Sequence, residues 1–272
     1  MNRQASNVGR HHAAIGRIVH FKLRITTRSG LHIGAGKNQG LSGSDLPVIR
    51  DAEGCAMIPG SSLRGVLRAG IESLCVGLGQ ASYPEHRNTR ERGDGPRGSY
   101  DLETFHELWE ELDLVERLFG VASGASYGSR VQFSDLMSVD PSQCRLEIRD
   151  GVAIDRETRT VRGAGKFDKE VVQAGAVFEG RIRMLNPSDV EIGLIAQSLW
   201  MLDEGFLLLG GKKARGLGWV AVSVASLVDQ TARDILAGLP PSDSKAFTSV
   251  TETFDLHLTK LREAFASTSE RM

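Results

Sequence analysis

The clearest pattern of apolar and polar positions runs from His20 to Thr26. Phe21, Leu23 and Ile25 alternate there with polar residues, most of them basic. A period of two places the apolar side chains on one face of a strand. This segment therefore predicts a half-buried strand with a basic outer face. Further strands are predicted, from alternation and β-branched residues, at 46–50, 129–136, 144–154, 171–184 and 219–228.

Apolar residues at helical spacing predict the helices. The clearest helix start is Ile58 to Gly65, where Ser61 or Ser62 is expected to be the N-cap. Other helices are predicted at 101–119, which is strongly acidic, at 189–204, and in two short segments near the C-terminus. The order strand, helix, strands, helix, strand predicts an α+β fold with helices on one face of an antiparallel sheet.

The 272 residues are enough for one large domain with insertions. A polar, basic stretch at 1–17 predicts a flexible N-terminal tail. The domain itself is expected at 18–228, with a basic insertion at about 79–100 and a long hairpin at about 150–170. The remaining residues, 229–272, are expected to form C-terminal helices.

The net charge is −1, which is low for a protein that binds nucleic acid. The distribution is uneven, however, because no carboxylate precedes Asp45, whereas seven Lys and Arg residues do. Acidic residues concentrate between Asp101 and Glu116. The asymmetry indicates a basic face that could follow a phosphate backbone, although a solvated surface with chance clustering explains it equally well.

The three cysteines lack any C-x-x-C spacing, which argues against a disulfide framework and a cysteine-based zinc site. No apolar run resembles a signal peptide or is long enough to span a bilayer. We therefore expect a cytoplasmic protein with no membrane partner.

The predicted helix start at Ser61 and Ser62 is a candidate anion site, because N–H groups at a helix N-terminus attract phosphate. Arg64 and Arg68 are one turn apart and could hold neighbouring phosphates. Taken alone, this pattern is more typical of an ordinary capped helix with solvated arginines.

The segment from Gly210 to Gly218 combines a glycine-rich backbone with Lys212, Lys213 and Arg215. Glycine permits close approach of the main chain to a ligand, and the cations neutralise phosphate. The spacing is not that of a nucleotide-binding P-loop, so a nucleotide cofactor is not expected.

Asp45 lies in a glycine- and serine-rich loop and is surrounded by basic sequence. Such a carboxylate could bind a divalent metal or handle a proton beside a phosphodiester. A loop aspartate that hydrogen-bonds its own turn is the more ordinary interpretation. His32 could act near RNA, but most histidines at strand ends are structural.

Several motifs in this order resemble the RAMP superfamily, specifically the repeated backbone subunit of type III CRISPR effector complexes. The matching segments are 30–34, 44–51, 58–65, 118–120, 131–135, 149–158 and 210–218. The resemblance implies a ferredoxin-like, RRM-like sheet. It also implies copies that stack along a guide RNA beside other effector subunits, with a thumb-like hairpin that splays the guide–target duplex. The Asp-Arg-Glu-Thr stretch favours the type III-D branch.

The resemblance also implies the site roles. Asp45 matches the residue that cleaves complementary target RNA, with a divalent metal, expected to be Mg²⁺, and a 2′,3′-cyclic phosphate product. RNA contacts are implied for His32, Ser61, Ser62, Arg64, Arg68, Lys212, Lys213 and Arg215. Two alternatives stay open: a structural RNA-binding subunit with an inert Asp45, and a guide-maturing RAMP endoribonuclease. The near-neutral charge and the lack of zinc-binding cysteines depart from some relatives.

Overall fold

The computed structural model describes residues 12, 14–36, 44–79, 109, 112–121, 127–238 and 247–269. Its strands are β1 (Arg17–Thr27), β2 (Val131–Phe133), β3 (Met137–Ser138), β4 (Leu146–Ile154), β5 (Val161–Val172), β6 (Val177–Leu185) and β7 (Val220–Thr231). Its helices are α1 (Gly60–Gly77), α3 (Leu114–Phe119), α4 (Asp189–Asp203), α5 (Ala232–Leu236) and α6 (Val250–Ser269), with a 3-10 turn at Lys213–Arg215. No helix among these is long and apolar enough to cross a membrane.

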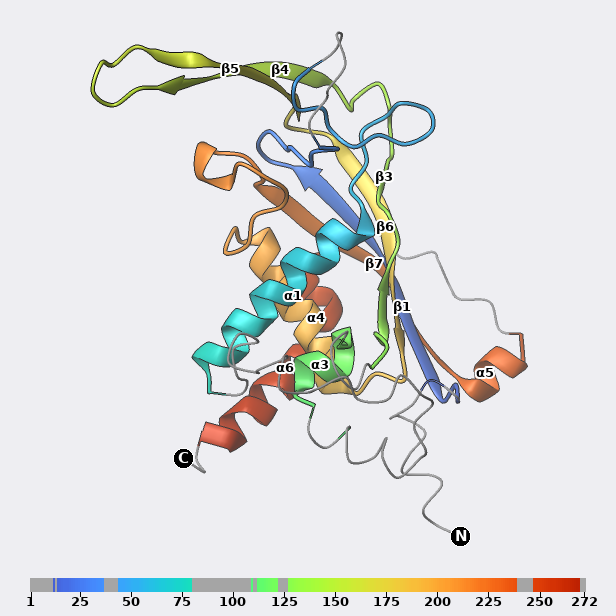
Figure 1. Cartoon of the computed structure of the whole chain (residues 1–272). Coiled ribbons are helices and arrows are strands. Elements are labelled where there is room, and N and C mark those ends of the chain that lie inside the picture. Colours follow the sequence, from blue (N-terminus) through green and yellow to red (C-terminus); the bar gives the residue numbers. More distant parts are fainter. Residues whose placement is uncertain are drawn as a thin grey trace, which may run out of the picture.

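The main sheet is antiparallel, in the order β2-β6-β1-β7, and β3 also pairs with β6. Helices α1, α4 and α6 cover one face of this sheet (Figure 1). The predicted α+β fold with helices on one face is confirmed. Helix α5 lies apart from these three, at the end of β7 (Figure 1).

Strand β1 forms the centre of the sheet, and its alternation is as predicted. Phe21, Leu23 and Ile25 are fully buried under the helices, and the Phe21 ring meets Phe254 of α6 edge-on at 5.1 Å. Basic residues occupy the opposite face, where the Arg24 guanidinium lies 3.9 Å from the centre of the Phe247 ring. Apolar burial on one face and cations on the other therefore follow directly from the period of two.

Helix α1 starts two or three residues earlier than its serines predict. Its N-cap is Pro59, so the expectation that Ser61 or Ser62 caps this helix is wrong. The Asp135 carboxylate, from the segment after β2, accepts a hydrogen bond from Gly60 N–H at 2.8 Å. A Cβ at residue 60 would lie 2.5 Å from the Phe133 carbonyl oxygen, so glycine allows the helix start to pack against β2.

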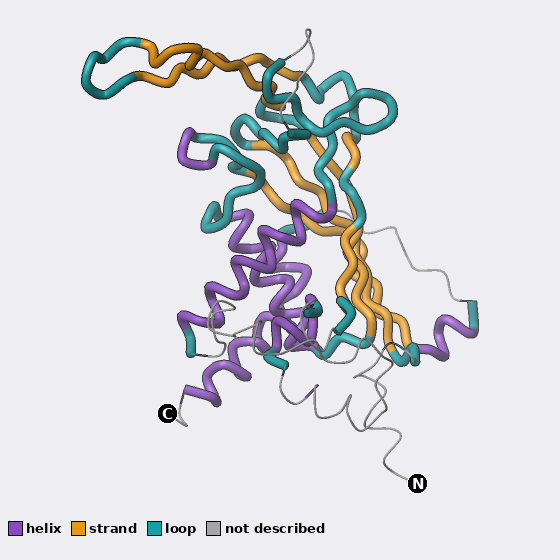
Figure 2. The backbone as a smooth tube through the Cα atoms, viewed as in Figure 1, coloured by secondary structure: helices purple, strands orange, loops and turns teal. Residues whose placement is uncertain are grey.

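A second, two-stranded sheet is the hairpin β4–β5. It projects away from the body of the molecule at the end opposite α5 (Figure 2). The expected strand at 171–184 is in fact the end of β5 and most of β6, separated by a turn that contains Gly175 with φ of 94°. The expected strand at 46–50 is absent from the assigned strands; these residues make only isolated bridges.

Two predicted segments fall largely outside the described residues. Most of the N-terminal tail at 1–17 lies there, and so does the insertion at 79–100 apart from Gly79. The acidic helix expected at 101–119 is described mainly at its end, as α3.

Candidate nucleic-acid interface

Strand β5 is the element on which the candidate residues meet, and Asp45 docks against its edge. The Asp45 carboxylate accepts a hydrogen bond from Asp168 N–H at 3.0 Å. In return, the Asp168 carboxylate accepts from Asp45 N–H at 2.7 Å and from the Ser44 hydroxyl at 2.6 Å. The hydroxyl of Ser44 and the amide of Asp45 hold the pKa of Asp168 below its usual value. Asp45 is thus fixed at the base of the hairpin with its side chain exposed.

Glu170, two residues further along β5, holds the rest of that loop. Its carboxylate accepts from Val48 N–H at 3.0 Å and from the Arg50 guanidinium at 2.9 Å. Its backbone N–H donates to the Leu46 carbonyl oxygen at 3.0 Å. The loop after residue 44 therefore lies along β5 through alternate carboxylates, Asp168 and Glu170, which point to the same side of the strand.

His32 connects β5 to the glycine-rich loop. Its ring Nδ1–H donates to the Glu170 carbonyl oxygen at 2.7 Å, and only 6% of the residue is exposed. Its own carbonyl oxygen accepts from Gly211 N–H at 2.8 Å. A Cβ at Gly210, where φ is 78°, would lie 2.5 Å from that carbonyl oxygen. His32 thus has a structural role, positioning the loop against the hairpin base.

The cations of the glycine-rich loop are presented to solvent. Lys212 adopts the left-handed conformation with φ of 59°, and the 3-10 turn Lys213–Arg215 follows it. All three basic side chains are exposed. The Arg215 guanidinium lies 6.0 Å from the centre of the Phe167 ring on β5. The loop and the hairpin base therefore form one basic surface. Their separate sequence patterns did not predict this.

Arg64 and Arg68 are engaged within the protein itself. The Arg64 guanidinium donates to the Phe119 carbonyl oxygen at 2.6 Å, and that of Arg68 donates to the Gly120 carbonyl oxygen at 3.1 Å. Arg68 also pairs with Glu72 at 2.7 Å. Burial, together with the charge of Arg68, lowers the pKa of Arg64. The two arginines bind the C-terminal end of α3, where free carbonyl oxygens attract cations.

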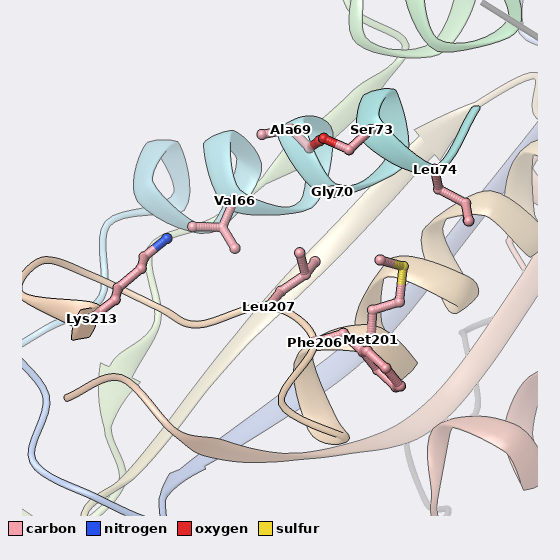
Figure 3. A pocket seen from close by; sticks show the side chains of 9 residues that line it. All are labelled: Val66, Ala69, Gly70, Ser73, Leu74, Met201, Phe206, Leu207 and Lys213. Carbon is pink, nitrogen blue, oxygen red and sulfur yellow. The ribbon is translucent and has the colours of Figure 1, made fainter. Parts of the chain in front are cut away.

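A pocket of about 490 Å³ separates α1 from the end of α4 and the glycine-rich loop. Figure 3 shows Lys213 extending from that loop toward the end of α1 that carries Val66. The pocket residues of α1, Val66, Gly70 and Ser73, lie about 120–180° around the helix from Arg64, given 100° per residue. The structure thus brings the glycine-rich loop close to α1 but not to the side of α1 that carries the two arginines.

The site offers few metal ligands. Within the described ranges, no group of three or more His, Cys, Asp or Glu residues could hold a metal ion. Asp45 and Asp168 provide two neighbouring carboxylates. This set fits Mg²⁺, which proteins commonly bind through one or two carboxylates plus phosphate oxygens and water.

Sequence reasoning missed Lys169, Arg149 and Phe167, which lie on the face of the hairpin that meets the glycine-rich loop. The strand period of two places Lys169 on the same face as Phe167, so this part of the arrangement could have been predicted from the sequence. Two of the cations that approach Lys169, Lys212 and Arg215, are more than 40 positions away in the sequence, and only the fold brings them to it.

The comparisons with known proteins cover these same elements. The family model of the RAMP superfamily matches residues 24–221. A similar protein is the CRISPR system Cms endoribonuclease Csm3 of Methanocaldococcus jannaschii, which is 30% identical over 205 residues. That match covers 71% of this chain and 74% of the relative.

Proposed function

Because the chain belongs to the RAMP superfamily, we propose that it is an RNA-binding backbone subunit of a type III CRISPR effector complex. Its partners in this role are a guide RNA, complementary target RNA, further copies of itself or related RAMP subunits, and the other effector subunits. The similarity to the Methanocaldococcus jannaschii endoribonuclease supports this assignment. The fold supports it through a hairpin that projects freely beside an exposed basic loop.

The proposed guide-binding surface is the glycine-rich loop together with the hairpin base. Lys212, Lys213 and Arg215 are exposed and can neutralise phosphates without reading sequence. His32 acts indirectly in this proposal, by holding the loop through its carbonyl oxygen. Contacts from the start of α1, at Ser61 and Ser62, remain part of the proposal.

Arg64 and Arg68 contribute less than their spacing predicts. Each already donates to a carbonyl oxygen of the segment that ends α3. A phosphate contact would use only the guanidinium N–H groups that face away from those carbonyls. Their main effect in this proposal is to fix α3 against α1.

We further propose that Asp45 cleaves the target RNA. The observation that carries this is the pair of reciprocal hydrogen bonds between Asp45 and Asp168, which presents an exposed carboxylate at the base of the hairpin. A nucleotide splayed by the hairpin there would bring its 2′-hydroxyl within reach of that carboxylate. Asp45 would orient the hydroxyl or accept its proton during in-line attack on the adjacent phosphate. The bond from phosphorus to the 5′-oxygen would break as the new bond forms, leaving a 2′,3′-cyclic phosphate and a 5′-hydroxyl that takes its proton from water.

Asp45, with Asp168 beside it, would also hold the proposed Mg²⁺. When bound, this ion supplies charge neutralisation at the phosphate that is attacked. The hydrogen bond from the Ser44 hydroxyl keeps Asp168 ionised, and Asp168 in turn fixes the backbone of Asp45.

The test is Asp45→Ala in the assembled complex, with cleavage of a complementary RNA measured in magnesium. We expect cleavage to fall by at least about 100-fold, the range for removing a group that acts in proton transfer, with RNA retention unchanged. Asp255→Ala is the matched control, because Asp255 is an exposed aspartate on α6. Undiminished cuts in the Asp45 variant would remove Asp45 from the mechanism.

A binding-only subunit is the second candidate. It is favoured by the same hydrogen bonds, which give Asp45 a structural role even without chemistry. In that case the wild-type complex retains complementary RNA but leaves it uncut under the same conditions.

A further inference from the structure

Lys169, in the middle of β5, is an almost completely buried lysine. Only 6% of the residue is exposed, although buried lysines are normally paired with a carboxylate. Within the described part of the chain, Lys169 forms no ion pair. The ammonium nitrogen of Lys169 is not a fully buried atom that lacks a hydrogen-bond partner. The side chain is therefore packed along its length while its charged tip reaches a surface.

The charged groups that surround Lys169 are cations. Arg149 is directly opposite it in the β4–β5 register, so the two side chains share one face of the hairpin. Burial lowers the pKa of Lys169, and the charges of Arg215, Lys212 and Arg149 lower it further. Arg149 pairs with Glu147 on the same face of β4, whereas Lys169, Lys212 and Arg215 form no ion pair within the described part of the chain. The charges of these three cations repel one another, and a bound anion would relieve that repulsion.

An aromatic ring completes this face. Phe167 lies two residues before Lys169, on the same side of β5. Its ring packs over Gly151 of β4, where any Cβ would overlap it. The ring centre is 6.0 Å from the Arg215 guanidinium. Cations that follow a backbone, together with an aromatic ring that stacks a base, are the combination used for single-stranded nucleic acid.

The glycine-rich loop is held against this face rather than lying there by chance. Gly218 N–H donates to the Gly30 carbonyl oxygen at 2.9 Å. A Cβ at Gly30 would lie 2.6 Å from Val171 Cγ1 and 2.9 Å from Leu217 Cδ2. Glycine at position 30 thus allows the chain to pass between the hairpin and the loop, and the cluster is built before any ligand arrives.

We propose that the inner face of the hairpin is a phosphate-binding site centred on Lys169, in which Arg149, Lys212 and Arg215 surround one phosphodiester of RNA and Phe167 stacks on the adjoining base. This proposal rests on the proposed RNA binding. It adds Lys169, Arg149 and Phe167 to the interface, and it assigns the site to a single-stranded nucleotide rather than to free phosphate.

The test is Lys169→Met in the full chain, with binding of a labelled single-stranded RNA measured over a range of salt concentrations. We expect affinity to fall about tenfold at low salt, as for loss of a charge-assisted contact. The slope of log affinity against log salt should fall by about 0.7, the value for one phosphate of a single strand. Thermal stability should not fall, because the substitution removes a buried, unpaired cation.

Two further variants separate binding from folding. Lys166→Met is the matched control, since Lys166 is on the opposite face of β5 and is 71% exposed beside Asp150; its affinity and slope should match the wild type. Lys169→Arg retains the charge and should retain most of the affinity. If it binds as weakly as Lys169→Met, the role of Lys169 is structural and the proposal is overturned.

The remaining outcomes are also decisive. Unchanged affinity and slope in Lys169→Met would overturn the phosphate site while leaving the proposed RNA binding intact. Absence of RNA binding by the wild-type chain would overturn both. Inorganic phosphate serves as the competing probe: displacement of the RNA by millimolar phosphate alone would assign the site to the free ion instead.

Discussion

The helix-covered sheet and the hairpin end of the molecule are held together by different interactions. Under α1, α4 and α6, fully buried apolar side chains from β1 and its neighbours form one continuous core. At the hairpin, partly exposed carboxylates bind backbone amides and a guanidinium, and β4–β5 leaves Ile148 and Ile154 about two-thirds exposed. The core supplies stability, because apolar burial is its main source.

The two regions also differ in how they treat charge. In the helix-covered region, Arg130 is buried and paired with Glu191. At the hairpin, Lys169 is buried among cations instead. Buried charge that is left uncompensated beside an exposed loop is expected to serve a ligand. The comparison therefore separates residues that stabilise the fold from residues that are available to bind a ligand.

The largest expected effect on stability is that of Arg130→Met. Its guanidinium donates to the carbonyl oxygens of Arg117 at 2.9 Å and Asn186 at 2.8 Å, besides pairing with Glu191. Removing it leaves Glu191 buried and uncompensated, so the free energy of unfolding should fall by about 3–5 kcal/mol. Urea unfolding followed by circular dichroism measures this loss.

Adding Glu191→Gln to Arg130→Met gives the control for that effect. The double variant should recover part of the lost stability, because no isolated charge remains buried. RNA affinity of the folded fraction should equal that of the wild type in both variants. If Arg130→Met lowers the free energy of unfolding by less than about 1 kcal/mol, as for an exposed ion pair, its buried ion pair does not stabilise the helix-covered region as proposed.

An intermediate effect is expected for Glu170→Ala at the hairpin. The substitution removes the acceptor of Val48 N–H and of Arg50, and losing such charge-assisted bonds is worth about 1.5–3 kcal/mol locally. Hydrogen exchange of residues 44–50 should accelerate, and cleavage should fall with Asp45 less well fixed. Global unfolding should change little, because the core does not depend on this loop.

Glu179→Ala is the matched control for Glu170→Ala. Both glutamate side chains are 16% exposed, and Glu179 pairs with Lys22 and Arg24 on the main sheet. Its substitution should leave exchange at 44–50 unchanged. If hydrogen exchange of residues 44–50 accelerates equally in both variants, the segment responds to a general loss of stability and not to the loss of its hydrogen bonds with Glu170.

Much of the fold could be predicted from local pattern, and much of the site could not. Alternation around Phe21 placed β1 and its two faces correctly. The cap of α1 was misassigned because Asp135, which accepts from Gly60 N–H, is 75 positions away. The spacing of Arg64 and Arg68 suggested phosphates, whereas α3 supplies carbonyl oxygens that helical periodicity does not reveal. Long-range contacts decide such roles, and one sequence carries little information on them.

The smallest expected effect is a pH response confined to the helix layer. His257 of α6 is 12% exposed and faces Asp189, Arg17, Lys260 and Asp229. Its Nδ1 has no hydrogen-bond partner in the described structure, and burial lowers its pKa. Because burial lowers the pKa of His257 in the folded chain, the unfolded chain has the higher pKa. On acidification, the unfolded chain therefore binds the proton at a higher pH than the folded chain does. Stability should therefore decline as pH falls through the ordinary value of about 6.5.

The hairpin end should not share this response, since the lowered pKa of Asp168 keeps its contacts charged until pH falls through that lower value. Urea midpoints at about pH 7.5 and about pH 5.5 measure the decline, and His257→Gln should show less of it than the wild type. Hydrogen exchange of the segment 44–50, corrected for the intrinsic effect of pH, should stay constant over the same interval. If instead this segment opens at the lower pH while the variant and the wild type lose stability equally, the titrating group belongs to the hairpin end and not to α6.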